Sequence, residues 1–382
     1  MMRHWTATDS SFEVRAMPFY WRLSDSVEGF PDIPTRLPMR VSVSGEFDYV
    51  VSRPTADEWA VLEHAYAQDA NIGFLNPESG QLGTYGASVN SFIEDVARSF
   101  QPSRIFEIGC GAGATIDHLR RTGGWKVVGI DPSAYSKAWS ERLGFELIND
   151  FFGPGVLDED ADFIYCNDVF EHVPEVTRFA GHVCDALRPG GVFAVATTSS
   201  TRSIELGDLS MLEHQHVNMF SDNGIREILT SAGFHEIDVG RGSHGNTFHV
   251  VARKAPAGAA TKPGGGGPTS AGFVERAVAR AEAFERFYAS HPSCAYYVPL
   301  RCIPYLALVG DHGQSDVFDS NRAWRGKYID GYGRPIRHVD ELTGTDLPPF
   351  FIGSLTFFDE IQAMLVSMGV PREHTFAITT LA

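Results

Sequence analysis

The chain of 382 residues contains few cysteines, five in all, at positions 110, 166, 184, 294 and 302, and no Cys-x-x-Cys pair. This spacing supports neither a disulfide framework nor the ligand set of a structural zinc site. The sequence also lacks an apolar run as long as a membrane span, and its first residues, MMRHWTATDSSFEVR, lack the apolar core of a secretory signal. We therefore expect a cytoplasmic protein with reduced thiols and no metal site.

Positive charge is scarce as well, with 31 Lys and Arg against 48 Asp and Glu and a formal net charge of −17. A general nucleic-acid binder or a protein that adheres to anionic membranes would need a basic face. We expect neither kind of partner. Hydrophobic residues at 43% and charged residues at 21% are typical of a globular enzyme. The length suits two domains, and the oligomeric state stays open, a homodimer included.

The most informative stretch is RIFEIGCGAGATIDHLRRTGGWKVVGIDP, residues 104–132, which predicts a strand, a glycine-rich turn, a helix and a second strand. Gly109, Gly111 and Gly113 directly follow the first strand, and Asp131 ends the second. In an open parallel α/β sheet, ligands bind at the carboxyl ends of the strands. Glycines there allow the backbone to approach the ligand closely, and a carboxylate can bind a ribose diol.

Glu107 precedes the first glycine, where the strand of a nicotinamide-dependent oxidoreductase usually stays apolar. The string EIGCGAG resembles the first motif of class I S-adenosylmethionine-dependent methyltransferases. The resemblance implies a Rossmann-like α/β sheet with helices on both faces and S-adenosylmethionine as the cofactor. It also implies that Glu107 lies near the cationic part of the cofactor and that Asp131 binds its ribose hydroxyls. The oxidoreductase is the weaker alternative.

Later segments extend the resemblance: NDF at residues 149–151, NDVFEHV at 167–173 and LRPGG at 187–191. A tyrosine just before the core often reaches the methionine carboxylate of the cofactor in this family. The cofactor-binding residues that the resemblance implies are Tyr85, Glu107, Gly109, Cys110, Gly111, Gly113, Asp131, Pro132, Asp150, Phe151, Asn167 and His172. The alternatives are an ordinary turn carboxylate for Asp150 and a brace of the loop for His172.

The segment LEHQHVNMFS, residues 212–221, resembles the H-E-H-x-x-Y-F segment of sugar C-methyltransferases from antibiotic pathways. Alignment on Phe220 implies a catalytic set of Glu213, His214 and His216, with His216 as the general base. A histidine titrates near neutral pH and can take the proton of the acceptor as the methyl group arrives. The tyrosine partner of the family falls on Glu213, so the proton pathway differs or the acceptor is another compound.

Three further residues are expected to bind the acceptor: Asn218, and His244 and Asn246 from a turn that resembles the H-G-G-S turn of the same family. Two alternatives stay open for the two histidines of residues 212–221. His216 could simply bind a backbone carbonyl, and the pair beside a glutamate could hold a metal, for which no third or fourth ligand is evident.

The chain divides by composition into four parts. Residues 1–80 are expected to form a cap on the catalytic domain or a lid over the substrate, and residues 81–254 the cofactor-binding domain. Residues 255–272, APAGAATKPGGGGPTSAG, have the composition of a linker. Residues 273–382 resemble the smaller C-terminal half-Rossmann α/β domain of the sugar C-methyltransferases, without the glycine turn of its first strand, although Arg301 could meet an anion. The N-terminal zinc cysteines of that family are absent.

These features together predict an S-adenosylmethionine-dependent methyltransferase that acts on a small molecule in specialised, antibiotic-type metabolism. C-methylation with His216 as the general base is the favoured chemistry. The alternatives are N- or O-methylation with His216 only orienting the acceptor, and a non-catalytic scaffold that binds the cofactor.

Overall fold

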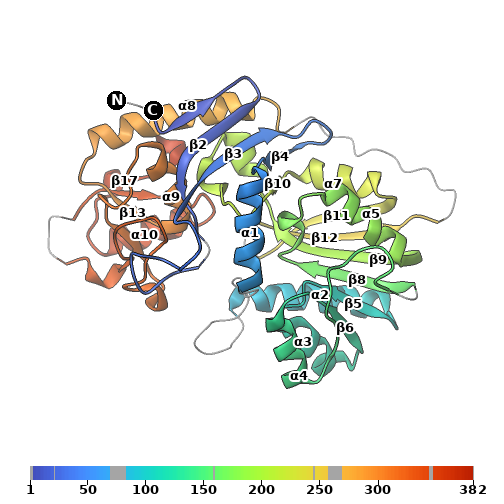
Figure 1. Cartoon of the computed structure of the whole chain (residues 1–382). Coiled ribbons are helices and arrows are strands. Elements are labelled where there is room, and N and C mark those ends of the chain that lie inside the picture. The colour runs from blue at the N-terminus through green and yellow to red at the C-terminus, as the bar shows by residue number, and fades with distance from the viewer. Residues whose placement is uncertain are drawn as a thin grey trace.

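The computed structural model describes residues 3–20, 22–68, 83–157, 160–243, 246–256, 269–343 and 347–381. Figure 1 shows a central α/β body, coloured cyan to yellow, beside a C-terminal unit coloured orange to red. The N-terminal strands, in blue, lie at the top of this view. None of the described helices is both long and apolar enough to span a lipid bilayer.

The central body is built on a seven-stranded sheet in the order β11-β12-β9-β8-β5-β6-β7. Five strands are parallel: β5 (Ile105–Ile108), β6 (Val127–Ile130), β7 (Glu146–Ile148), β8 (Ala161–Asn167) and β9 (Leu187–Thr198). Two antiparallel strands complete the sheet next to β9, namely β12 (Thr247–Lys254) and β11 (Phe234–Arg241). The chain runs outward from β5 to β7 and then crosses to β8 on the other side of β5. The topological switch therefore lies between β5 and β8, and the predicted Rossmann-like α/β fold is confirmed.

Helices cover both faces of this sheet, because its inner strands are apolar on both sides. Along β8, Phe163 and Tyr165 pack with α2 (Thr84–Phe100) and α3 (Ala114–Gly123). Ile164 and Cys166, which alternate with them, pack on the opposite face with α5 (Val176–Ala186) and α7 (Asp222–Ser231). Each of these four side chains is fully buried. Burial of a large apolar side chain is worth about 1.5–3 kcal/mol.

The N-terminal strands form a second, antiparallel sheet in the order β1-β2-β3-β4-β10. Its members are β1 (Trp5–Ala7), β2 (Ser11–Pro18), β3 (Arg36–Val43), β4 (Tyr49–Ser52) and β10 (Asn218–Phe220). Strands β3 and β4 form a hairpin, and helix α1 (Ala56–Gln68) follows it. Through β10 this sheet is joined to the central body, while side chains of β2 and β3 pack in one hydrophobic cluster with the C-terminal unit. No pattern in the sequence indicated this second partner.

The C-terminal unit is a small parallel α/β structure, of the kind predicted. Its strands, in the order β15-β14-β13-β16-β17, are β13 (Ala295–Tyr297), β14 (Val317–Asp319), β15 (Arg337–His338), β16 (Phe350–Ile352) and β17 (Thr375–Phe376). Its helices are α8 (Phe273–Ser290), α9 (Pro299–Leu308) and α10 (Phe358–Ser367).

Three element boundaries bear on the site. Strand β9 begins at Leu187 and its pairing with β8 is interrupted over residues 188–191, where Gly190 has a positive φ of 75°. Helix α2 begins at Thr84, so that Tyr85 lies in its first turn. Helix α9 begins at Pro299, because proline at the first position of a helix loses no hydrogen bond. Arg301 is therefore on a helix rather than in a turn.

One buried carboxylate connects the central body to the C-terminal unit. Asp208 lies between α6 (Thr201–Leu206) and the 3-10 turn η2 (Leu209–Met211), and it is fully buried. Its oxygens accept hydrogen bonds from the Tyr305 hydroxyl of α9 at 2.6 Å and from the Ser210 hydroxyl and amide at 2.6 and 3.0 Å. A fourth donor is the Ser203 hydroxyl at 3.0 Å. The carboxylate is therefore fully supplied with donors, as a buried charge requires.

We predict that Tyr305→Phe lowers the free energy of unfolding by about 1–3 kcal/mol, because it leaves a buried carboxylate one donor short. The Tyr305 hydroxyl also accepts a hydrogen bond from the Leu209 amide at 2.9 Å. Tyr296→Phe is the matched control, since its hydroxyl is buried in the same cluster without a partner in the described part of the chain. Chemical denaturation should show a loss for the first variant and none for the second. Equal stabilities of the two variants would contradict this role of Asp208.

Candidate functional site

The glycine turn after β5 lies at the topological switch. Gly109, Gly111 and Gly113 have positive φ angles of 71°, 50° and 69°, which side chains adopt only with strain. A Cβ added to Gly109 would lie 2.4 Å from Val169, and one added to Gly113 would lie 2.4 Å from Phe145. Both the backbone conformation and the close packing therefore require glycine at these positions.

Asp131, at the end of β6, holds this turn from the side. Its Oδ2 accepts a hydrogen bond from the Gly111 amide at 3.0 Å. Its Oδ1 accepts from the amide and the hydroxyl of Ser133 at 2.9 and 2.6 Å. Ser133 in turn caps α4 (Ala134–Leu143). The carboxylate is thus fixed beside the glycine turn, the place expected for a group that binds ribose hydroxyls.

Glu107 is buried beneath the same turn. Its Oε2 accepts a hydrogen bond from the Tyr165 hydroxyl at 3.1 Å and its Oε1 accepts from Asn167 Nδ2 at 3.2 Å. Burial raises the pKa of Glu107 to about 8, against the opposing effect of these two hydrogen bonds. Asn167 keeps a buried Oδ1 without a partner in the described part of the chain. Glu107 therefore offers a carboxyl group whose pKa a nearby cation would lower, and Asn167 offers an oxygen that can accept a hydrogen bond.

Tyr85 reaches from α2 to the end of β8. Its hydroxyl donates a hydrogen bond to Asp168 Oδ1 at 2.5 Å. Asp168 has a positive φ of 51°, a conformation that aspartate tolerates better than most residues and that recurs at functional sites. Burial raises the pKa of the Asp168 carboxyl, and the neighbouring Glu171 raises it further. Tyr85 and Asp168 thus form a hydrogen-bonded pair at the carboxyl ends of the parallel strands, where the cofactor is predicted to bind.

The other predicted cofactor residues contribute less through their side chains. Cys110 points into the hydrophobic core, where burial raises the pKa of its thiol, so only its backbone belongs to the turn. Asp150 accepts a hydrogen bond from the Phe151 amide at 2.8 Å, which is a local turn. Phe151 itself is 75% exposed. Pro132 is also exposed, next to Asp131.

A second group of side chains lies where the 3-10 turn η1, which follows β8, approaches the loop before β10. His172 Nδ1 is 2.8 Å from the Gln215 carbonyl oxygen and 3.1 Å from the Tyr66 hydroxyl of α1. The ring centroids of His172 and His216 are 5.0 Å apart. One ligand atom each of Glu171, His172 and His216 lies within 4.8 Å of the other two. The loop brace expected of His172 is present, and it brings His172 against His216.

His216 and Glu213 form a partly buried pair. The Nδ1 of His216 lies 3.9 Å from Glu213 Oε2. Burial lowers the pKa of His216 to about 4, although Glu213 acts in the opposite direction. Burial alone would raise the pKa of Glu213, but His216 and Arg301 lower it. At neutral pH the ring is therefore neutral and the carboxylate ionised.

His214 does not join this pair, contrary to the prediction of a catalytic role. Residues 213–217 form a turn rather than a strand, so side chains two positions apart do not share a face. His214 Nε2 lies 3.2 Å from the Leu37 carbonyl oxygen, and its ring packs edge-on against Phe19. His214 therefore attaches the loop to the N-terminal segment.

The predicted acceptor-binding residues separate in the same way. Asn218 is fully buried in β10 and donates from Nδ2 to the Val173 carbonyl oxygen at 2.7 Å. It braces the segment after η1, and its role toward the acceptor stays a prediction. Asn246 lines a cavity, and its carbonyl oxygen accepts a hydrogen bond from the Ser199 amide at 2.7 Å. His244 lies outside the described residues.

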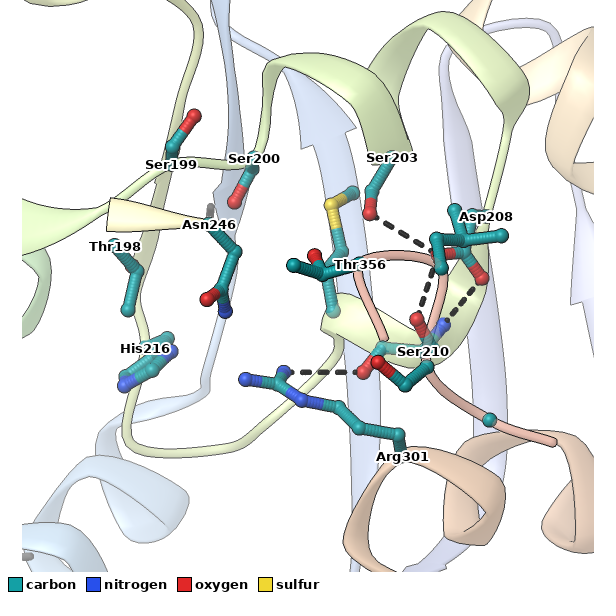
Figure 2. A pocket seen from close by; sticks show the side chains of 14 residues that line it. Thr198, Ser199, Ser200, Ser203, Asp208, Ser210, His216, Asn246, Arg301 and Thr356 are labelled. Carbon is teal, nitrogen blue, oxygen red and sulfur yellow. Dashed lines mark hydrogen bonds between the residues drawn. The ribbon is translucent and has the colours of Figure 1, made fainter. Parts of the chain in front are cut away.

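A polar cavity of about 480 Å³, a volume that includes solvent at its mouth, opens beside His216 (Figure 2). Its lining residues are Thr198, Ser199, Ser200, Ser203, Asp208, Ser210, Met211, His216, Asn246, Arg301, Gly353, Ser354, Leu355 and Thr356. Figure 2 shows His216, Asn246 and the head of Arg301 on one side and Asp208 on the other. Arg301 Nη1 donates to the Ser210 carbonyl oxygen at 3.2 Å. The cavity therefore combines hydroxyls from the central body with a guanidinium from the C-terminal unit.

Several of these site residues were missed by sequence reasoning. Asp168 and Glu171 belong to the motif NDVFEHV, and two carboxylates next to a histidine were a signal that could have singled them out. Tyr66 has no such local signal, because it reaches His172 only through the packing of α1. Arg301 was expected to meet an anion, but its place in a cavity shared with His216 depends on how the two halves of the chain pack.

Comparison with known proteins identifies the central body. Residues 85–239 match the family model of a methyltransferase domain. This range extends from the first turn of α2 into β11 and includes the glycine turn, Asp131, Asn167 and His216. The match covers less than half of the chain.

Three curated relatives are also named as methyltransferases. The chain is 34% identical over 114 residues to the ubiquinone biosynthesis O-methyltransferase of Paramagnetospirillum magneticum, which covers 28% of this chain and 45% of that protein. It is 26% identical over 166 residues to the C-methyltransferase NovU of Streptomyces niveus, covering 42% and 39%. It is 27% identical over 150 residues to the sterol 24-C-methyltransferase of Eremothecium gossypii, covering 34% and 39%. The chain thus spans less than half the length of these relatives.

We predict that S-adenosylmethionine binding near neutral pH releases a proton from Glu107. Because burial raises the pKa of this carboxyl to about 8, it is mostly protonated in the free protein, and a cation nearby lowers its pKa. Calorimetry in buffers of different ionisation enthalpy measures the released proton. Glu107→Gln should abolish this part of the buffer dependence, and a wild-type binding heat that is independent of the buffer would contradict the prediction.

Proposed function

We propose that this chain, whose residues 85–239 form a class I S-adenosylmethionine-dependent methyltransferase domain, transfers the methyl group of that cofactor to a polar small molecule. The observation that supports an acceptor site most directly is the cavity beside His216, next to the ends of β8 and β9. Because the chain matches only part of its relatives, the activity of the whole protein is part of this proposal.

The lining of the cavity favours a hydroxyl-rich acceptor that carries an anionic group. Seven of its residues have hydroxyls, namely Thr198, Ser199, Ser200, Ser203, Ser210, Ser354 and Thr356. Arg301 offers a guanidinium suited to a carboxylate or phosphate. The net charge of −17 supports a cytoplasmic enzyme that works on a small molecule rather than on nucleic acid or a membrane surface.

Methyl transfer is an in-line displacement at a sulfonium, so the protein mainly positions the reactants, excludes water and accepts the proton of the acceptor. His216 is the candidate for the last task, with Glu213 beside its Nδ1. The likeness to NovU supports C-methylation in specialised, antibiotic-type metabolism. O-methylation is the second candidate, supported by the likeness to a ubiquinone biosynthesis O-methyltransferase. In that case His216 orients the acceptor.

Binding of S-adenosylhomocysteine tests the cofactor assignment. We expect the purified chain to bind it in a calorimetric titration and to show no binding of NADH. Asp131→Asn should weaken this binding tenfold or more, because hydrogen bonds to a charged group are worth about 1.5–3 kcal/mol. Asp185→Asn, on the exposed end of α5, serves as the charge-matched control and should leave the affinity unchanged. Equal affinities of the two variants would remove Asp131 from the site.

Substitution of His216 tests the acceptor side. We predict that His216→Ala lowers turnover by roughly 10²–10⁴-fold, the usual contribution of general acid–base catalysis, with little change in S-adenosylhomocysteine affinity. His216→Asn should keep a hydrogen-bonding group and remain slow if the ring accepts a proton. If His216→Asn restores turnover, the residue only orients the acceptor, and the base assignment is refuted.

A further inference from the structure

Glu171, His172 and His216 meet in space although they come from two separate segments of the chain. Glu171 and His172 belong to η1 (Phe170–His172), and His216 belongs to the loop before β10. One ligand atom of each lies within 4.8 Å of the others. Ligands about 2.1 Å from one ion lie roughly 3–4 Å apart, so small side-chain movements bring these three atoms to a common ion.

The surroundings of the two histidines indicate which ring nitrogen carries the proton and which keeps its lone pair. His172 Nδ1 is 2.8 Å from the Gln215 carbonyl oxygen, which can only accept, so Nδ1 carries the proton and Nε2 keeps its lone pair. His216 Nδ1 is 3.9 Å from Glu213 Oε2, which is beyond hydrogen-bond distance, so a small side-chain movement would let Glu213 hold the same tautomer. Metal-binding histidines typically direct their other nitrogen to a carbonyl or a carboxylate in this way.

Two carboxylates lie close together here, Glu171 of the cluster and the neighbouring Asp168, and a positive charge would stabilise both. Glu171 is 1% exposed, and its Oε2 accepts a hydrogen bond from the Thr197 hydroxyl at 2.8 Å. Asp168, three residues earlier, lies close enough that the two carboxylates repel each other. In the described part of the chain, no Lys or Arg nitrogen comes within 4.0 Å of either carboxylate. Burying the Glu171 carboxylate without a cation, with the partly buried Asp168 carboxylate beside it, is costly, and a bound cation lowers that cost.

We propose that Glu171, His172 and His216 bind a divalent first-row transition-metal ion. Two imidazoles and one carboxylate on one side of an ion leave positions open on the other side. Because His216 also lines the cavity, those positions face the place proposed for the acceptor. The metal site itself stands on the cluster alone, whereas its role toward an acceptor rests on the proposed function.

That role is to bind acceptor oxygens and lower their affinity for protons. An acceptor hydroxyl bound to the ion loses its proton to solvent, and its oxygen forms a bond to the methyl carbon. The carbon–sulfur bond breaks at the same time, and its electron pair stays on the sulfur of S-adenosylhomocysteine. In this arrangement His216 is a ligand of the ion and not the general base, which selects O-methylation, the second candidate under the proposed function. The acceptor is then a hydroxyl compound with a second oxygen in reach of the same ion.

Titration of the chelator-treated chain with Co²⁺ and Mn²⁺ tests the site without any assay of activity. We expect stoichiometric binding, with the visible absorption of Co²⁺ bound to nitrogen ligands. Glu171→Gln, His172→Asn and His216→Asn should each weaken binding at least tenfold. Glu213→Gln, which changes only the partner of His216, should weaken it roughly 10–100-fold. His118→Ala, which removes a histidine–carboxylate contact elsewhere on the surface, is the control and should bind as the wild type does.

Thermal midpoints distinguish a loss of metal binding from a loss of folding. Each thermal midpoint is measured without metal, and Mn²⁺ should raise the midpoint of the wild type and of His118→Ala but not of the three ligand variants. A wild-type chain that binds neither ion, or ligand variants that bind as tightly as the control, would overturn the proposal. Binding of S-adenosylhomocysteine without binding of metal would refute only the metal site. Binding of metal without binding of S-adenosylhomocysteine would refute only the proposed function.

Discussion

The hydrogen bonds to the Asp208 carboxylate are the constraint on which the shape of the candidate acceptor site depends. A buried charge has to be surrounded by donors, and Asp208 obtains one of its four from Tyr305 of the C-terminal unit. The others come from Ser203 and Ser210 of the central body. This network fixes α9 against η2. Arg301, about one helical turn before Tyr305 on α9, therefore faces the cavity that His216 also lines.

The second feature that organises the site is an excess of acid at one edge of the sheet. Glu107, Asp131, Asp168 and Glu171 follow or end strands β5, β6 and β8, and each is held by hydroxyl, amide or other neutral donors. Neutral donors satisfy the oxygens but do not balance the charge. The edge therefore suits ligands that bring positive charge. In our proposals, the sulfonium and ammonium groups of S-adenosylmethionine would supply it at Glu107, and a divalent cation would supply it at Glu171.

Sequence reasoning succeeded where a residue's role is set by its own strand and turn. Gly109, Gly113 and Asp131 could be placed because a parallel strand ends at a known edge of the sheet, and the structure shows that a Cβ at either glycine would collide. It failed where the role depends on packing between distant segments. His214 and His216 look equivalent in sequence. Because the chain turns at these residues, His214 lies against Leu37, whereas His216 lies against His172.

We propose that the strand ends around Glu107 and Asp131 and the cavity beside His216 form one reaction site, with the methyl group passing from one to the other. A crystal structure of the chain with S-adenosylhomocysteine bound tests this most directly. We expect the adenosine ribose at Asp131, the amino-acid part near Glu107 and Asn167, and the sulfur facing the side of the cavity that His216 lines. A sulfur that faces away from His216, or a cofactor bound elsewhere on the chain, would contradict it.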